Sequence, residues 1–470
     1  MKRIKYYLAA LVATVLLLSS CSDSFFDINT DPNNPAQATA ALVLPSGMSG
    51  SAFVMGGYYQ SLGGFWAQQY AQAPAASQWA DWESYNVTED DFDRQFTTLY
   101  AGSLNDYEYV RKLAASNGNW SYYAISTLMQ AYTFQVVADL YDKVPFTEAL
   151  QGDGNLQPHY TDGQVIYDSL LVRIDDAMSK NFKAKSSQDP GTNDLIFQGQ
   201  MKDWQKFANT LKLKMYLRYV NVDVNKYSAQ IKALLTENNF LDKDAKFSAF
   251  KAEETGYNPF FNTFVDRLAG NVIANKTLID SLTTWGDPRK AVMFNPSLVG
   301  ANYNGLATGD SKNHPTLKID NYATPAIGNI SPVYFFTKEE TLFLVAEAQT
   351  RYGTIAAAQK AFDNGVKASL VGLNLADTAI TYPYKGIESI NKGIESIIVQ
   401  KWAASTNKRS IEAFFDYNRT GYPSTFSKSI TSVLSGTDRP KRLFFPASER
   451  KSNSNTPARV ALTEKVWWGK

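Results

Sequence analysis

Cysteine and histidine are almost absent from this chain, which has one cysteine and two histidines among 470 residues. A single cysteine excludes any intramolecular disulfide. His159 and His314 each stand next to a proline, in settings typical of turns. No HExxH, paired-cysteine or clustered carboxylate–histidine spacing indicates a metal site, and the chain lacks a GxSxG elbow, a phosphate loop and a GxGxxG turn. We therefore expect no metal, no cofactor and no catalytic residue.

An excess of charge of either sign is absent as well. The 46 lysine and arginine residues oppose 45 aspartate and glutamate residues, for a net charge of +1. This balance argues against a nucleic-acid-binding surface. Aromatic residues are abundant, at 13% of the chain. Their flat faces and polar atoms suit both a core and a binding surface, so composition alone does not divide them between the two.

The N-terminus has the pattern of a bacterial lipoprotein signal. Basic residues at positions 2, 3 and 5 precede an apolar run at 8–18, which is too short to span a bilayer but suits a signal peptide. The run closes on Leu-Ser-Ser before Cys21, which is similar to a lipobox. We expect a signal peptide over 1–20, lipid on Cys21 and a tether over 21–40, with several acyl chains giving a stable membrane anchor. An ordinary secretory signal with an incidental cysteine is the alternative.

Helical periodicity is present in several segments of the remainder, residues 41–470. Apolar residues recur at three- and four-residue steps over 122–140, 207–215 and 338–349, and a further helix is predicted over about 388–402. Gly353 should break the third of these, and Thr354 should cap a following helix. Two such helices with a tight turn resemble a tetratricopeptide hairpin, although no strict 34-residue period is present.

Long stretches over 251–335 and 420–457 are rich in glycine, proline and asparagine and have no clear period. The sequence therefore predicts a mainly α fold, in which tetratricopeptide-like hairpins form a scaffold and a large loop-rich half is available for binding. The length exceeds what a single core usually supports, so two subdomains or one domain with long excursions are expected.

Two polar–aromatic clusters are candidate binding residues. The first is Trp79, Trp82 and Tyr85, whose helical spacing would place three rings on one side. Packing of that side in the core is the alternative interpretation. The second cluster, Asn302-Tyr303-Asn304, lies in the irregular 251–335 region. In both, flat rings could stack on the apolar faces of sugars while neighbouring amides bond hydroxyls.

Several segments, in order along the chain, resemble the SusD/RagB family of nutrient-binding outer-membrane lipoproteins, in its second SusD-like subgroup. Residues 139–149, DLYDKVPFTEA, are similar to the family's Asp-x-Tyr-Gly-Asp-x-Pro-Tyr-Ser-Glu-Ala stretch, but Asp142 stands where glycine is usual. Further similar segments are FDINTDPN at 26–33, DWQKFANTLKLKMYLR at 203–218, DPR at 287–289, AEA at 346–348, QKW at 400–402, RTGYP at 419–423, RLFFP at 442–446 and WW at 467–468.

The resemblance implies a scaffold of tetratricopeptide-like hairpins and a partner, a SusC-like TonB-dependent β-barrel transporter over which the lipoprotein sits as a lid. It also implies an outer-membrane location, lipid-anchored and facing the cell surface. The leading hypothesis is capture of oligosaccharides for delivery to the barrel. Oligopeptide capture, a structural subunit without a ligand, and glycoside hydrolysis by two carboxylates are the alternatives.

Overall fold

The computed structural model describes residues 38–375 and 380–470. The predicted signal peptide over 1–20, the lipid-bearing Cys21 and the tether as far as residue 37 lie outside the described residues. Within them, helices predominate and every paired strand is short, so the predicted mainly α fold is confirmed.

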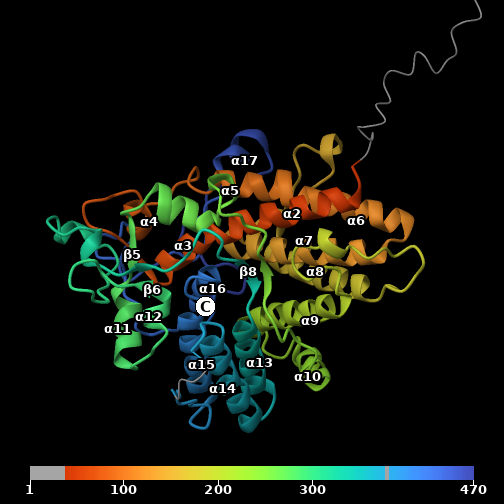
Figure 1. The fold of residues 1–470 in the computed structure, drawn as a ribbon. Helices are drawn as coiled ribbons and strands as arrows, with labels where there is room; N and C mark the ends of the chain where they lie inside the picture. Colours follow the sequence, from red (N-terminus) through yellow and green to blue (C-terminus); the bar gives the residue numbers. More distant parts are fainter. Residues whose placement is uncertain (1–37, 376–379) are drawn as a thin grey trace, which may run out of the picture.

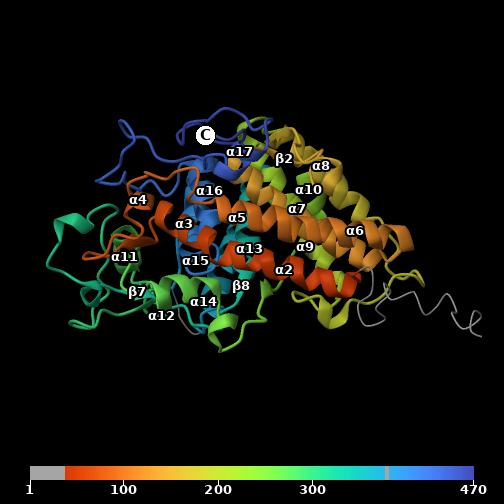
Figure 2. The same cartoon turned by 90° about the horizontal axis from the view of Figure 1, so that it is seen from above.

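Long helices form one half of the molecule, in which several helices that follow one another along the chain pack side by side (Figures 1 and 2). They are α2 (Ala40–Gly56), α3 (Tyr58–Trp66), α6 (Asn105–Asn117), α7 (Trp120–Tyr141), α8 (Gly163–Met178), α9 (Met201–Arg218), α10 (Ser228–Glu237), α13 (Lys338–Tyr352), α14 (Ile355–Val371), α15 (Ile390–Ala404) and α16 (Ser410–Thr420). The predicted helices at 122–140, 207–215, 338–349 and 388–402 correspond to α7, α9, α13 and α15.

The hairpin of α13 and α14 is built as the sequence predicts. Thr337 caps α13 by accepting from the amide of Glu340, and Thr354 caps α14 by accepting from the amide of Ala357. Gly353 lies between the two helices. At their contact, a Cβ on Gly365 would lie 2.8 Å from the ring of Phe343, so only glycine permits this close approach.

The other half is rich in loops and carries short elements (Figure 1). Its helices are α4 (Ala80–Glu83), α11 (Lys276–Thr284) and α12 (Lys290–Met293), while α5 (Asp93–Thr97) and α17 (Ala447–Ser452) lie nearer the scaffold. Among the described residues, four antiparallel two-stranded ladders are present: β1 (Tyr70–Gln72) with β5 (Val272–Ala274), β2 (Lys143–Pro145) with β3 (Tyr160–Asp162), β4 (Ala245–Phe247) with β8 (Val333–Phe336), and β6 (Phe294–Asn295) with β7 (Thr324–Pro325).

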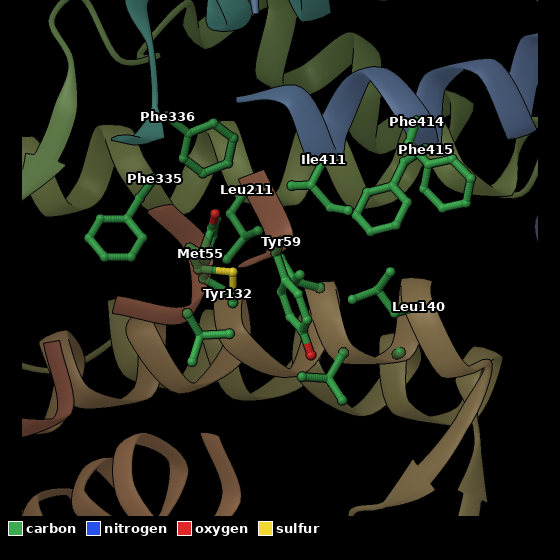
Figure 3. Close-up of a cluster of buried hydrophobic side chains, with 14 of the residues drawn as sticks. Met55, Tyr59, Tyr132, Leu140, Leu211, Phe335, Phe336, Ile411, Phe414 and Phe415 are labelled. Atoms are coloured by element: carbon green, nitrogen blue, oxygen red, sulfur yellow. The ribbon is translucent and has the colours of Figure 1, made fainter. Parts of the chain in front are cut away.

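The largest hydrophobic cluster among the described residues extends from the helical half into the loop-rich half. Figure 3 shows its centre, where Met55 and Tyr59 lie between Tyr132 of α7, Phe335 of β8 and Ile411 of α16. The stretch Ala40–Trp66 is long and apolar enough to cross a membrane. The buried side chains of α2, such as Leu44, Met48 and Ala52, belong to this core, and in α3 every residue except the first is buried.

A network of buried ion pairs ties the helices together. Its charged side chains come from α7, α9, α13, α15, α16 and the residue before α16, and each is at most 5% exposed: Asp139, Lys214, Arg218, Glu340, Glu347, Lys401, Arg409, Glu412, Asp416 and Arg419. Glu412 is central, because it accepts from Lys214 at 2.7 Å, from Arg218 at 3.0 Å and from Arg409 at 3.0 Å. Buried charges of this kind are tolerated only when all are paired.

Asp142 ends α7 with a backbone φ of +65°, on the side of conformational space that favours glycine. The aspartate has a role of its own here, since its Oδ1 accepts from the amide of Trp467 at 2.7 Å. The carboxylate thus fixes the C-terminal segment against α7.

Candidate functional site

A cavity of about 700 Å³ opens in the loop-rich half, among residues 276–322. This volume is in the range of small-molecule binding sites. Its lining includes the predicted cluster Asn302, Tyr303 and Asn304, which the structure brings together with a second polar–aromatic group: Asp280, Asp310, His314, Asn321 and Tyr322.

Hydrogen bonds hold the loops of the cavity to the adjacent ladder. The side chain of Asn275 caps α11 and also donates to the hydroxyl of Thr308 at 2.8 Å. Leu306 forms a bridge beside β5, and its carbonyl accepts from the amide of Lys276 at 2.9 Å. A Cβ on Gly305 would lie 2.7 Å from that same amide nitrogen, so glycine is required for this approach. The wall of the cavity is therefore attached to β5 and to the start of α11.

The carboxyl group of Glu83 holds the cavity loop at Gly309, three residues after Leu306. It accepts from the amide of Gln72 in β1 at 2.8 Å and from the amide of Gly309 at 3.1 Å. Burial raises the pKa of Glu83 to about 8, opposed by these two backbone amides and reinforced by the charge of Asp310. The carboxyl group thus joins the core to the residue that precedes Asp310.

The cavity offers both kinds of contact that a sugar needs. Tyr303 is half-buried, and the ammonium of Lys290 lies 5.5 Å from the centroid of its ring. Asn304 donates to the carbonyl of Asn321 at 3.1 Å, and the imidazole of His314 lies 3.1 Å from the carboxylate of Asp310. Rings, amides and a carboxylate at one opening can stack on apolar C–H faces and bond hydroxyl groups.

The aromatic cluster Trp79, Trp82 and Tyr85 requires a correction. The three side chains are only 4%, 3% and 1% exposed, so none presents a free face to a ligand. Helix α4 is too short to align them, and Tyr85 lies beyond it with a φ of +62°. The ring of Trp82 lies 4.6 Å from that of Trp79 and 5.1 Å from that of Phe92. Core packing, the alternative interpretation, describes their positions.

Sequence reasoning did not predict Tyr322, Asn321, Asp310 or His314 as neighbours of Asn302-Tyr303-Asn304. One signal was present: the pair Asn321-Tyr322 repeats the pair Asn302-Tyr303 within the same irregular region. What brings the pairs together is a loop closed by backbone bonds, in which the amide of Ala323 donates to the carbonyl of Asn304 at 2.9 Å. Nothing in residue periodicity indicates such a closure.

Over residues 38–375 and 380–470, no group of three or more histidine, cysteine, aspartate or glutamate side chains is placed to hold a metal ion.

A family model described as "starch-binding associating with outer membrane" matches residues 32–446. The chain belongs to this SusD-like family. The resemblance drawn from the sequence segments is thereby confirmed, and with it the assignment to nutrient-binding proteins associated with the outer membrane. No curated protein sequence matches the chain.

Solved SusD-like structures share the fold. A SusD homologue from Bacteroides uniformis has a TM-score of 0.74 and 22% identity, over 91% of this chain and 99% of that one. A protein described as chitin-binding has a TM-score of 0.75 and 22% identity, over 92% and 100%. A SusD homologue from Bacteroides fragilis has a TM-score of 0.75 and 19% identity, over 92% and 99%. At these identities the likeness establishes the SusD-like fold alone.

Proposed function

We propose that this SusD-like protein is a binding protein and not an enzyme. It captures oligosaccharides at the cell surface, in the cavity of residues 276–322. It then passes them to a SusC-like TonB-dependent β-barrel transporter. The observation that carries the ligand class is the pairing of half-buried Tyr303 with exposed Asn302 and Asn304 at one opening of about 700 Å³. The family description supports the same class of ligand.

An oligopeptide ligand would favour a different lining. Peptides are held through backbone pairing along a strand edge and through charged anchors at their ends. The cavity instead presents two tyrosines and three asparagines beside two carboxylates and a histidine. Oligosaccharides therefore match this lining better than peptides do, and both classes are compared in the titration described next.

Replacing Tyr303 by alanine should weaken oligosaccharide binding about 30-fold. A stacked ring that is truncated costs about 2 kcal/mol by analogy with interface hot spots, and 1.4 kcal/mol corresponds to a factor of ten. Calorimetric titration of wild type and variant with maltoheptaose, chitohexaose and neutral tetrapeptides measures the effect. Tyr303→Phe keeps the ring and should retain most of the affinity. Peptide binding without sugar binding, or equal sugar affinity in wild type and Tyr303→Ala, would contradict the proposal.

The anchor and the partner belong to the same proposal, supported by the lipobox-like Leu-Ser-Ser-Cys ending at Cys21 and by the family description. Cys21→Ala should remove the lipid, so that the protein leaves the outer-membrane fraction or remains unprocessed with its fold intact. Wild type purified from native membranes in mild detergent should bring down a large β-barrel, which the variant should recover in smaller amounts. A cleaved Cys21→Ala protein that stays in the outer membrane would exclude lipid on Cys21 as the anchor. Wild type that never crosslinks to a barrel in cells would exclude the partner.

A further inference from the structure

A second cavity, of about 460 Å³, lies in the helical half between α6, α7, α8 and the segment that follows β2. In Figures 1 and 2, α6 and α8 lie at the end of the molecule opposite to α11 and α12. This cavity is therefore separate from the one among residues 276–322. We refer to it as the α6–α8 cavity.

Positive charge is in excess in the α6–α8 cavity. Its lining contains three cationic side chains, Arg111, Lys112 and Arg173, and one carboxylate, Glu108. Glu108 is already fully engaged, because it accepts from Arg111 at 2.7 and 3.0 Å and from the amide group of Gln130 at 3.1 Å, and it lies 3.3 Å from Lys112. One carboxylate thus neutralises only one of three cations.

Arg173 is the cation of this cavity that has no carboxylate partner among the described residues. Among residues 38–375 and 380–470 no carboxylate lies within ion-pairing distance of it, and its one hydrogen bond runs from Nη1 to Oε1 of Gln130 at 3.4 Å. Burial lowers the pKa of Arg173, and the neighbouring charge of Arg111 lowers it further. Asp176, one turn along α8, is paired with Lys180 at 2.6 Å. The remaining donors of Arg173 are therefore available to a ligand.

An aromatic ring orients the Arg173 guanidinium. Its Cζ lies 4.4 Å from the centroid of the Phe146 ring, which is 5% exposed and is itself packed edge-on against Phe134 at 4.9 Å. A guanidinium held in this way presents its planar fork in a fixed direction, as recognition of carboxylate, sulfate or phosphate oxygens requires. Phe134, Phe146 and Leu150 give the cavity an apolar wall beside the cations.

We propose that the α6–α8 cavity binds a small oxyanion, a carboxylate, sulfate or phosphate group, with Arg173 as its principal contact and Arg111 and Lys112 supplying further positive charge. The volume accommodates a molecule of about the size of an acidic monosaccharide. The site is independent of the oligosaccharide-binding proposal, since it involves different residues at the other end of the molecule.

Calorimetric titration at low ionic strength tests this site, with inorganic phosphate, sulfate, glucuronate, glucose-6-phosphate and neutral glucose as probes. At least one anion should bind and glucose should not, and added salt should weaken the binding. Preference for glucuronate or glucose-6-phosphate over the inorganic ions would identify the sugar-borne group as the ligand; equal binding of inorganic phosphate would identify the free ion.

Arg173→Gln should reduce the affinity for the bound anion about tenfold or more, because a hydrogen bond to a charged group is lost. Arg267→Gln removes one exposed arginine elsewhere and is the matched control; it should leave the affinity unchanged. Lys112→Gln alters only the exposed rim of the cavity, so it tests the site even if Arg173→Gln fails to fold, and it should weaken binding by a smaller factor. Absence of binding to every anion, or equal affinities in wild type, Arg173→Gln and Lys112→Gln, would overturn the proposal.

Discussion

Glu412→Gln should lower the free energy of unfolding by about 3–5 kcal/mol, the range found when one partner of a buried ion pair is removed. The variant would leave Lys214, which is 0% exposed, without its carboxylate partner at 2.7 Å. Arg218 and Arg409 keep other acidic partners in Asp139 and Glu340, so the loss concentrates on Lys214. Denaturant unfolding followed by circular dichroism gives the difference between the two proteins.

The effect of Glu412→Gln should also depend on pH. Burial alone would raise the pKa of Glu412, but the charges of Lys214, Arg218 and Arg409 hold it well below its ordinary value of 4.5. Because the folded-state pKa is depressed, the stabilisation is complete above the unfolded-state pKa and is lost as the pH falls through the folded-state pKa. The difference between wild type and variant should therefore shrink on acidification below about pH 4.5.

A surface pair serves as the control for Glu412. Glu395 lies 2.8 Å from Lys392, whose side chain is 50% exposed. Ion pairs near the surface contribute little to stability, so Glu395→Gln should have a small effect. Equal small effects at Glu395 and Glu412 would show that the buried network does not hold the scaffold together.

Trp82→Ala should cost about 3–5 kcal/mol of stability, the usual cost of removing a large aromatic side chain from a core. The centroid of the Trp82 ring lies 6.1 Å from that of Phe65, 5.8 Å from that of Tyr58 and 5.1 Å from that of Phe92. Truncation of Trp82 would leave a cavity between these rings. Thermal unfolding and oligosaccharide titration of the same variant provide the test. We expect a lower melting temperature and little change in affinity from Trp82→Ala.

Trp120→Ala, at the half-buried start of α7, is a matched control and should cost less. A Trp82→Ala protein with wild-type melting temperature and lost oligosaccharide affinity would restore the first aromatic cluster as the ligand surface.

Much of the helical part of the fold could be predicted from local sequence patterns. The apolar period predicted α7, α9 and α13, and a further helix was expected where α15 lies. The turn at Gly353 and the cap at Thr354 followed from residue type alone. These features depend on contacts within one or two turns of helix, so a single segment contains the information. The ladder of β1 and β5 could not be predicted in this way, because its two strands pair across some 200 residues and neither strand has a period of its own.

The two predicted binding clusters have different outcomes, because one is buried in the core and the other lines a cavity. Periodicity places rings on one side of a helix but does not say whether that side faces solvent or core, and for Trp82 it faces the core. Asn302-Tyr303-Asn304 lies in a region without period, where amides and rings have no helix face to fill. Its position at a cavity depends on Asn275, Glu83 and Leu306, whose bonds join distant segments.

Crystals of the protein soaked with maltoheptaose and, separately, chitohexaose test the central claim most directly, because they locate the ligand. The account predicts that an oligosaccharide is seen in the cavity of residues 276–322, with one ring against Tyr303 and hydroxyl groups within hydrogen-bond distance of Asn302 or Asn304. An ordered oligosaccharide bound elsewhere on the molecule, with this cavity empty, would contradict it.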